Sequence, residues 1–275
     1  MFQKSLAPIA LLFLSFPINP AFTQVSTASQ LSYADLADLS VETPLVIEAE
    51  IKSAIRVKPE RAPGLLQGYQ RFYVEAQVIN LIRGQNGIGR DINYLVDIPL
   101  DSRGRTPKLK KQHVLLFARR AGNAPGAIQL VALDAQINWS DQNAAMLRRI
   151  LTEAVAADPP PRITGIGNAF HVAGSIPGEG ETQIFLTTAS GQPVSLSVLR
   201  RPGQQPRWAV ALGEIVDESA ATPQRDSLLW YRLACFLPDQ MPEMALDPED
   251  ARVAREDYQF VLNGLGPCGR TRQAP

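Results

Sequence analysis

Hydrophobic and polar residues alternate with a period of two in the first half of the chain, which is the pattern of half-buried β-strands. The runs that carry this pattern, or a short continuous apolar stretch, are residues 45–51, 72–78, 92–98, 114–117 and 128–133. Loops rich in glycine, proline and charged residues separate them. We therefore expect a small five-stranded β-barrel, closed or partly closed.

The period then changes to that of a helix. In residues 141–157, Ala144, Leu147 and Leu151 fall on one helical face, and Ser140 or Asp141 can cap the start. The run Asp158-Pro159-Pro160-Pro161 ends this helix and stiffens the connection that follows, so it is the predicted domain boundary.

Alternation returns in the second half, where four strands are expected at residues 169–173, 182–188, 194–199 and 207–215. Tight turns at 189–192 and 201–203 join them into an antiparallel meander. Two helices, at 225–237 and 247–262, close the chain. The predicted fold class is therefore α+β: residues 24–158 form the β-barrel with its closing helix, and residues 159–275 form the meander with a disulfide-linked helical tail.

The first 23 residues have the layout of a secretory signal peptide. A positive start containing Lys4 precedes an apolar run at residues 6–16, which is too short to span a bilayer, and small residues follow. The processed chain is expected to start between Gln24 and Ser29. Since no later stretch is apolar enough to span a membrane, we expect a processed protein in the periplasm or the medium.

The cysteines fit this compartment. Cys235 and Cys268 are the only two in the chain, and in an oxidising compartment one structural disulfide is the simplest use for them. A metal site would need more ligands, and a catalytic thiol would leave the second cysteine unexplained. No metal or other cofactor is expected.

Bulk charge indicates no particular partner, because the chain without residues 1–23 has 26 basic and 27 acidic residues. One local cluster is basic: Arg103, Arg105, Lys108, Lys110 and Lys111 occupy nine positions without an acid. It can attract the acidic stretch 214–257, meet an anionic component of the cell envelope, or form a solvated hairpin tip. No aromatic residue interleaves it, so nucleic acid is not an expected partner.

No catalytic residue is assigned. The chain has no Gly-x-Ser-x-Gly motif for a hydrolase nucleophile, and Ser195 and Ser197 are expected on the solvated face of a strand. His171 could act as a general base if a carboxylate oriented it and a nucleophile approached. A surface or half-buried histidine in a strand is the competing interpretation.

The segments LVIEAEI (45–51), FYVEAQVINLIRG (72–84) and HVLLFAR (113–119) resemble the OB-like domain of the tissue-inhibitor-of-metalloproteinase type, as it occurs in exported bacterial proteins. This resemblance implies an OB-like barrel. It does not carry over the inhibitory mechanism, because the animal inhibitors chelate the protease's metal through an N-terminal cysteine that is missing here. RDSLLWYRLAC and DYQFVLNGLGPC resemble segments of a family of exported bacterial proteins. This resemblance implies export but does not indicate an activity.

The expected function is that of a non-enzymatic binding or interaction protein of the cell envelope, with an envelope protein or an anionic envelope component as partner. Two alternatives stay open. One is an exported hydrolase that uses His171 as general base, and the other is a folding or assembly factor for exported proteins.

Overall fold

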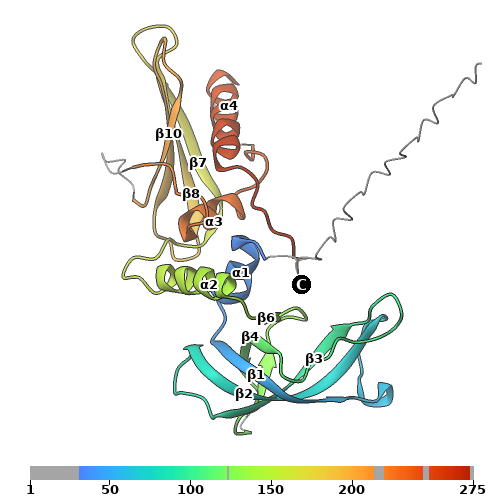
Figure 1. Cartoon of the computed structure of the whole chain (residues 1–275). Helices are drawn as coiled ribbons and strands as arrows, with labels where there is room; N and C mark the ends of the chain where they lie inside the picture. The colour runs from blue at the N-terminus through green and yellow to red at the C-terminus, as the bar shows by residue number, and fades with distance from the viewer. Residues whose placement is uncertain (1–30, 123, 214–219, 244–247, 273–275) are drawn as a thin grey trace, which may run out of the picture. The chain divides into compact units, whose positions relative to one another are not determined.

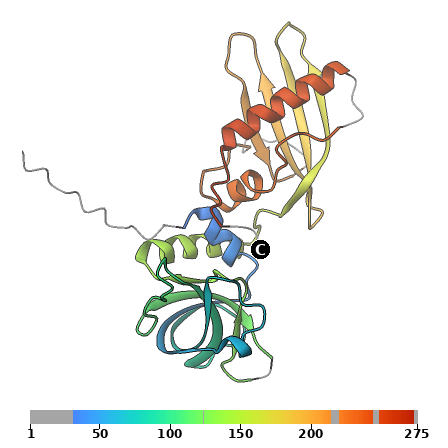
Figure 2. The ribbon, with the colours of Figure 1, turned by 90° about the vertical axis from the view of Figure 1, so that its right-hand side faces the viewer.

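The computed structural model describes residues 31–122, 124–213, 220–243 and 248–272, which form a mixed α+β fold with two antiparallel sheets (Figures 1 and 2). The expected signal peptide lies outside the described residues. The first sheet has the strand order β3-β2-β1-β4-β5, with β6 also paired to β4. Its strands are β1 (Leu45–Arg56), β2 (Tyr69–Arg83), β3 (Asp91–Pro99), β4 (His113–Arg120), β5 (Ile128–Leu130) and β6 (Gln136–Asn138).

The first sheet curls around an apolar interior. The pairing of β1 with β2 shifts register at three points, and such bulges bend a strand and increase its twist. Val74, Ile92 and Leu116 are fully buried on the inner face. The expected five-stranded barrel is not confirmed, because the sheet has a sixth strand and its edges β3 and β5 share a single bridge, Asn93–Ala127. The sheet is not a closed barrel.

Helix α1 (Tyr33–Ser40) precedes the first sheet and was not predicted. Ser32 and Asp35 cap its start reciprocally: each side chain accepts the other's backbone N–H at 3.1 Å. Seven of its eight residues are buried. A helix that is buried on every side has no polar face, so its sequence lacks the periodic stripe by which helices are recognised.

Helix α2 (Asp141–Ala154) confirms the predicted helix, and Ser140 caps it by accepting the Asn143 amide at 3.1 Å. Leu147 and Ile150 are fully buried in a core shared with α1. That core also contains Val46 of β1 and Phe117 of β4. The central strands of the first sheet are therefore covered on both faces, which explains the continuous apolar run at 114–117.

The second sheet is the expected antiparallel meander, with the order β10-β9-β8-β7. Its elements and the helices after it are β7 (Ile163–Ala173), β8 (Gly180–Thr188), β9 (Val194–Arg200), β10 (Arg207–Ala211), α3 (Leu228–Ala234) and α4 (Pro248–Leu265). Helix α4 lies across β7 and β8 (Figure 2) and buries Tyr258 and Val261 in the core that contains Ile184 and Leu196.

Helix α4 ends later than predicted. Gly264 stays within the helix, where a Cβ atom would lie 2.5 Å from Nε1 of Trp208, so the close approach of the ring requires glycine. Gly266 ends the helix with a φ of 69°, and its amide donates to the Leu262 carbonyl at 3.0 Å. The expected cap Asp247 lies outside the described residues.

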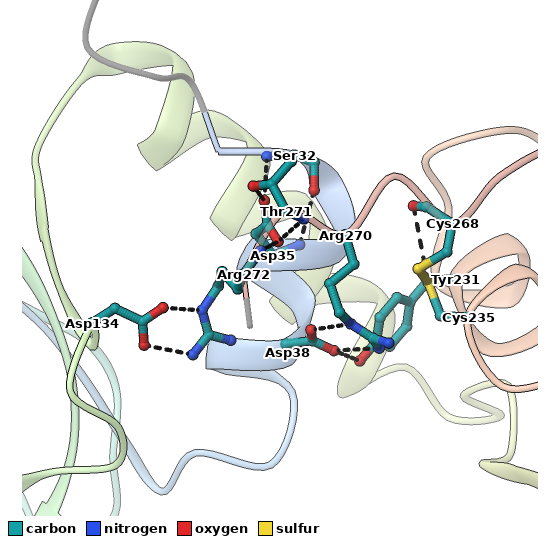
Figure 3. A network of polar contacts seen from close by, with 10 residues as sticks. All are labelled: Ser32, Asp35, Asp38, Asp134, Tyr231, Cys235, Cys268, Arg270, Thr271 and Arg272. Atoms are coloured by element: carbon teal, nitrogen blue, oxygen red, sulfur yellow. Dashed lines mark hydrogen bonds and ion pairs between the residues drawn. A yellow bond between two sulfur atoms is a disulfide. The ribbon is translucent and has the colours of Figure 1, made fainter. Parts of the chain in front are cut away.

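The predicted disulfide is confirmed. Cys235 and Cys268 are bonded, with their Cα atoms 4.9 Å apart. Cys235 follows α3 directly, and Cys268 follows α4, so the bond fixes the C-terminal segment beside α3 (Figure 3).

We predict that replacing both cysteines by serine lowers the free energy of unfolding by about 3–4 kcal/mol, because the bond closes a loop of 33 residues and so restricts the unfolded chain. Urea unfolding of the oxidised protein, the reduced protein and the double variant measures this change. The reduced protein and the variant should agree, and equal stability of all three would show that the bond contributes nothing.

Candidate functional site

The predicted basic cluster lies in the loop between β3 and β4, and the side chains of Arg103, Arg105, Lys108, Lys110 and Lys111 are all exposed. The Asp101 carboxylate holds the loop in shape. Its Oδ1 accepts hydrogen bonds from the backbone amides of Arg103 and Arg105, each at 2.8 Å, and Gly104 makes the turn with a φ of 70°. The cations are therefore displayed from an ordered loop.

Two further contacts anchor this loop to the sheet. Leu109 is buried in the interior of the first sheet, and the Lys111 amide donates to the Ile51 carbonyl at 2.7 Å. Because a buried leucine lies between them, Lys108 and Lys110 both remain exposed. Of the five cations, Arg105 has an ion pair, to Asp101 at 2.9 Å.

The end of β1 and the loop after it add residues that sequence reasoning missed. Nη2 of Arg56 lies 3.2 Å from the Thr106 hydroxyl, and the Leu100 amide donates to the Gly68 carbonyl at 2.8 Å. Both loops therefore leave the same end of the sheet (Figure 1). Arg56 and Lys58 are exposed there, and so is Ile55. We call Arg56, Lys58, Arg103, Arg105, Lys108, Lys110 and Lys111 the basic end.

The described part of the acidic stretch 214–257 has no ion pair with the basic end. Its described ion pairs go to arginines near or within the stretch: Arg252 pairs with Glu249 and Glu256, and Arg200 pairs with Asp257. Attraction between the two charged regions within one molecule is thus not observed among the described residues.

His171 belongs to a chain of polar groups on the second sheet. Its Nδ1 lies 2.9 Å from the Thr182 hydroxyl, which donates to Asp257 at 2.5 Å. Nε of Arg200 pairs with the same carboxylate at 2.7 Å. Thr182 and Asp257 are fully buried. A general base needs a carboxylate that orients it directly, whereas Thr182 stands between His171 and Asp257. The arrangement suits a packing role.

The serines also differ from expectation. Ser195 and Ser197 are both buried, so the interpretation that they lie on a solvated face is wrong. The Ser195 hydroxyl donates to the Gly213 carbonyl at 3.4 Å. No base approaches either hydroxyl among the described hydrogen bonds, so neither is set up as a nucleophile.

The most extensive polar network fastens the C-terminal segment 268–272 to helix α1 (Figure 3). Asp35 accepts four hydrogen bonds, from the Ser32, Thr271 and Arg272 amides and from the Thr271 hydroxyl. Asp38 pairs with Arg270 at 2.6 Å and accepts from the hydroxyl of Tyr231 at 2.6 Å. We call this segment the C-terminal strap.

The strap also reaches the first sheet. Arg272 makes a two-pronged ion pair with Asp134, which lies between β5 and β6, with N–O distances of 2.6 and 2.7 Å. These hydrogen bonds, which Arg272 donates to the Asp134 carboxylate, raise the pKa of Arg272 and lower the pKa of Asp134. Through Cys268, Arg270, Thr271 and Arg272, the strap is thereby bonded to α1, to Cys235 at the end of α3 and to the loop between β5 and β6.

Comparison with known proteins does not assign this chain: its sequence matches no protein-family model and no curated protein. The described residues contain no group of three His, Cys, Asp or Glu side chains that could hold a metal ion. Among them, too, no helix has the length and apolar character needed to cross a membrane.

The strap should make stability depend on pH. Burial acts to raise the pKa of Asp35, but the hydrogen bonds from Thr271 and Arg272 outweigh it and lower the pKa to about 2. A carboxyl group whose pKa is lowered by folding stabilises the folded protein at pH values above its ordinary pKa of about 3.9. This stabilisation is lost as the pH falls towards 2. We predict a loss of about 1–2 kcal/mol between pH 4.5 and pH 2 that comes from Asp35.

The measurement is urea unfolding at both pH values for the wild type, Asp35→Asn and the exposed control Asp158→Asn. Asp35→Asn places an amide group among four donors, so it should be less stable at neutral pH and lose less on acidification. The same acid loss in all three proteins would contradict the assignment to Asp35.

A second prediction concerns the His171 chain. Thr182→Val keeps the shape of the side chain but removes the buried hydroxyl that donates to the buried Asp257. It should therefore destabilise the protein by about 1–3 kcal/mol. His171→Gln alters only the half-buried end and should cost less than about 0.5 kcal/mol. Thermal unfolding measures both, and the reverse order would show that His171 is the essential member.

Proposed function

We propose that this protein is an exported, non-catalytic binding protein that attaches to an anionic component of the cell envelope through its basic end. The observation that carries the proposal is the exposure of seven cations at the end of β1 and on two adjoining loops. Backbone hydrogen bonds and the Asp101 carboxylate hold these loops in place. Phosphate and carboxylate groups are the anions that such a surface attracts.

Export is supported by the disulfide, because such bonds persist in oxidising compartments. It is also supported by the signal-like pattern of residues 1–23. For the first sheet we propose an OB-like, partly open barrel. Its strand order and the parallel bridge between β3 and β5 support this assignment, since OB folds are partly open five-stranded barrels.

An anionic membrane surface is the form of this partner that is easiest to test. Exposed Ile55, which is 60% accessible, lies beside Arg56 and would add apolar contact to the charge attraction. Each Lys or Arg near an anionic bilayer contributes about 1 kcal/mol, so several together give measurable binding without any membrane-spanning segment.

We predict that the triple change Arg103→Gln, Lys108→Gln and Lys110→Gln weakens binding to vesicles of phosphatidylglycerol and phosphatidylcholine by about 3 kcal/mol, or roughly 100-fold. None of these three side chains has an ion pair among the described residues, so the fold should not change. Sedimentation with vesicles at low salt measures the partition coefficient.

The matched control neutralises three exposed arginines elsewhere, with Arg148→Gln, Arg201→Gln and Arg255→Gln. It has the same net charge as the test variant and should bind nearly as well as the wild type. Raising the salt should weaken the wild type. If both variants lose the same affinity for the vesicles, net charge alone explains binding, and the basic end has no specific role.

A further inference from the structure

The loop between β1 and β2, residues 57–68, displays a leucine to solvent. Leu66 is 53% exposed and begins a tight turn, in which the Tyr69 amide donates to the Leu66 carbonyl at 3.2 Å. Gly68 has a φ of 82° in this turn, and a type II turn requires such a positive φ at its third position. A turn with the same kind of hydrogen bond precedes it, with Gly64 at a φ of 73°. The backbone on both sides of Leu66 is therefore fixed.

The loop lies beside the outer face of the first sheet. Nη1 of Arg71 on β2 donates to the Pro63 carbonyl at 3.1 Å, and Arg71 belongs to the outer face because it alternates with the buried Phe72. On the same face, Ile55 is 60% exposed and is paired in register with Tyr73. Exposed apolar side chains therefore lie both in the loop and on the adjoining part of the sheet.

The surroundings of these apolar side chains are strongly basic. Residues 56–68 and 99–112, which form this end of the sheet, contain eight basic residues and two acids. One of the two acids, Asp101, is already paired with Arg105 at 2.9 Å. An anionic surface that approaches this end therefore meets little repulsion, and it meets exposed apolar side chains together with the cations.

We propose that the partner of the basic end is an anionic lipid bilayer, and that Leu66 enters the boundary between its headgroups and acyl chains. This inference rests on the proposed function and specifies its partner. A soluble polyanion would neutralise the cations but leave Leu66 in water. A bilayer offers phosphate groups at its surface and an apolar layer directly below them, and binding at such an interface combines charge attraction with burial of apolar area. Ile55 would lie at the same boundary.

The first test compares binding to vesicles of phosphatidylglycerol and phosphatidylcholine with binding to soluble polyphosphate. Leu66→Ser should weaken vesicle binding about fivefold, because part of the transfer free energy of the leucine side chain is lost, and should leave polyphosphate binding unchanged. Serine is also common at the first position of a turn, so the fold should not change. The matched control is Ile79→Ser, which removes an apolar side chain of β2 that is 54% exposed, and it should alter neither interaction.

Salt separates the apolar contribution from the electrostatic one. Raising the salt should weaken vesicle binding of the wild type and of Leu66→Ser, but the ratio of their partition coefficients should stay the same, because burial of an apolar side chain is not screened. The loss caused by the triple change of Arg103, Lys108 and Lys110 to glutamine should instead become smaller.

A second variant, Leu66→Trp, reports directly on insertion. Lipids that carry bromine on their acyl chains quench an indole that reaches them, so quenching should exceed that of the wild type, which has Trp139, Trp208 and Trp230. Ile79→Trp is the control and should show no added quenching.

Vesicle binding that requires the cations, but is unchanged in Leu66→Ser and gives no added quenching in Leu66→Trp, would overturn insertion and leave the proposed function standing. Binding to polyphosphate without binding to vesicles would overturn the inference in favour of a soluble polyanion. If the protein binds neither, the inference and the proposed function both fail.

Discussion

Helix α1 is buried on nearly every side, and the rest of the described fold is arranged to supply its partners. Its apolar residues Leu36 and Leu39 lie in one core with residues of both sheets and of α2, α3 and α4. Its buried carboxylate, Asp35, needs hydrogen-bond donors, since a buried charge without partners is strongly destabilising. The C-terminal strap provides those donors, and the disulfide holds the strap in place.

Charged and polar side chains in the interior of this fold bond to one another and so stabilise it. Asp35, Asp38, Asp257 and His171 are all engaged in internal networks, so their ionisable groups are occupied. Among the described residues, the cations of the basic end take no part in these networks.

Most strands and the disulfide could be predicted, because alternation, turn residues and the presence of only two cysteines can be identified in the sequence itself. Helix α1 could not, because complete burial removes the polar face that marks a helix. Whether the first sheet closes could not be predicted either, since the approach of β3 to β5 depends on twist and bulges rather than on composition. Burial of Ser195 and Ser197 likewise depends on tertiary packing that alternation cannot show.

For the candidate site, the five cations of the β3–β4 loop were apparent as a run of like charges. Arg56 and Lys58 joined them only through contacts between two loops that are distant in sequence.

We infer that α1 and the C-terminal strap join both sheets into one cooperative unit. Native-state hydrogen exchange, read by mass spectrometry at the peptide level, tests this inference most directly. The slowest amides of α1, β4, β8 and β9 should exchange with one common free energy, equal to that of global unfolding. Slow amides in β8 and β9 that open at a clearly lower free energy than those of α1 and β4 would contradict it.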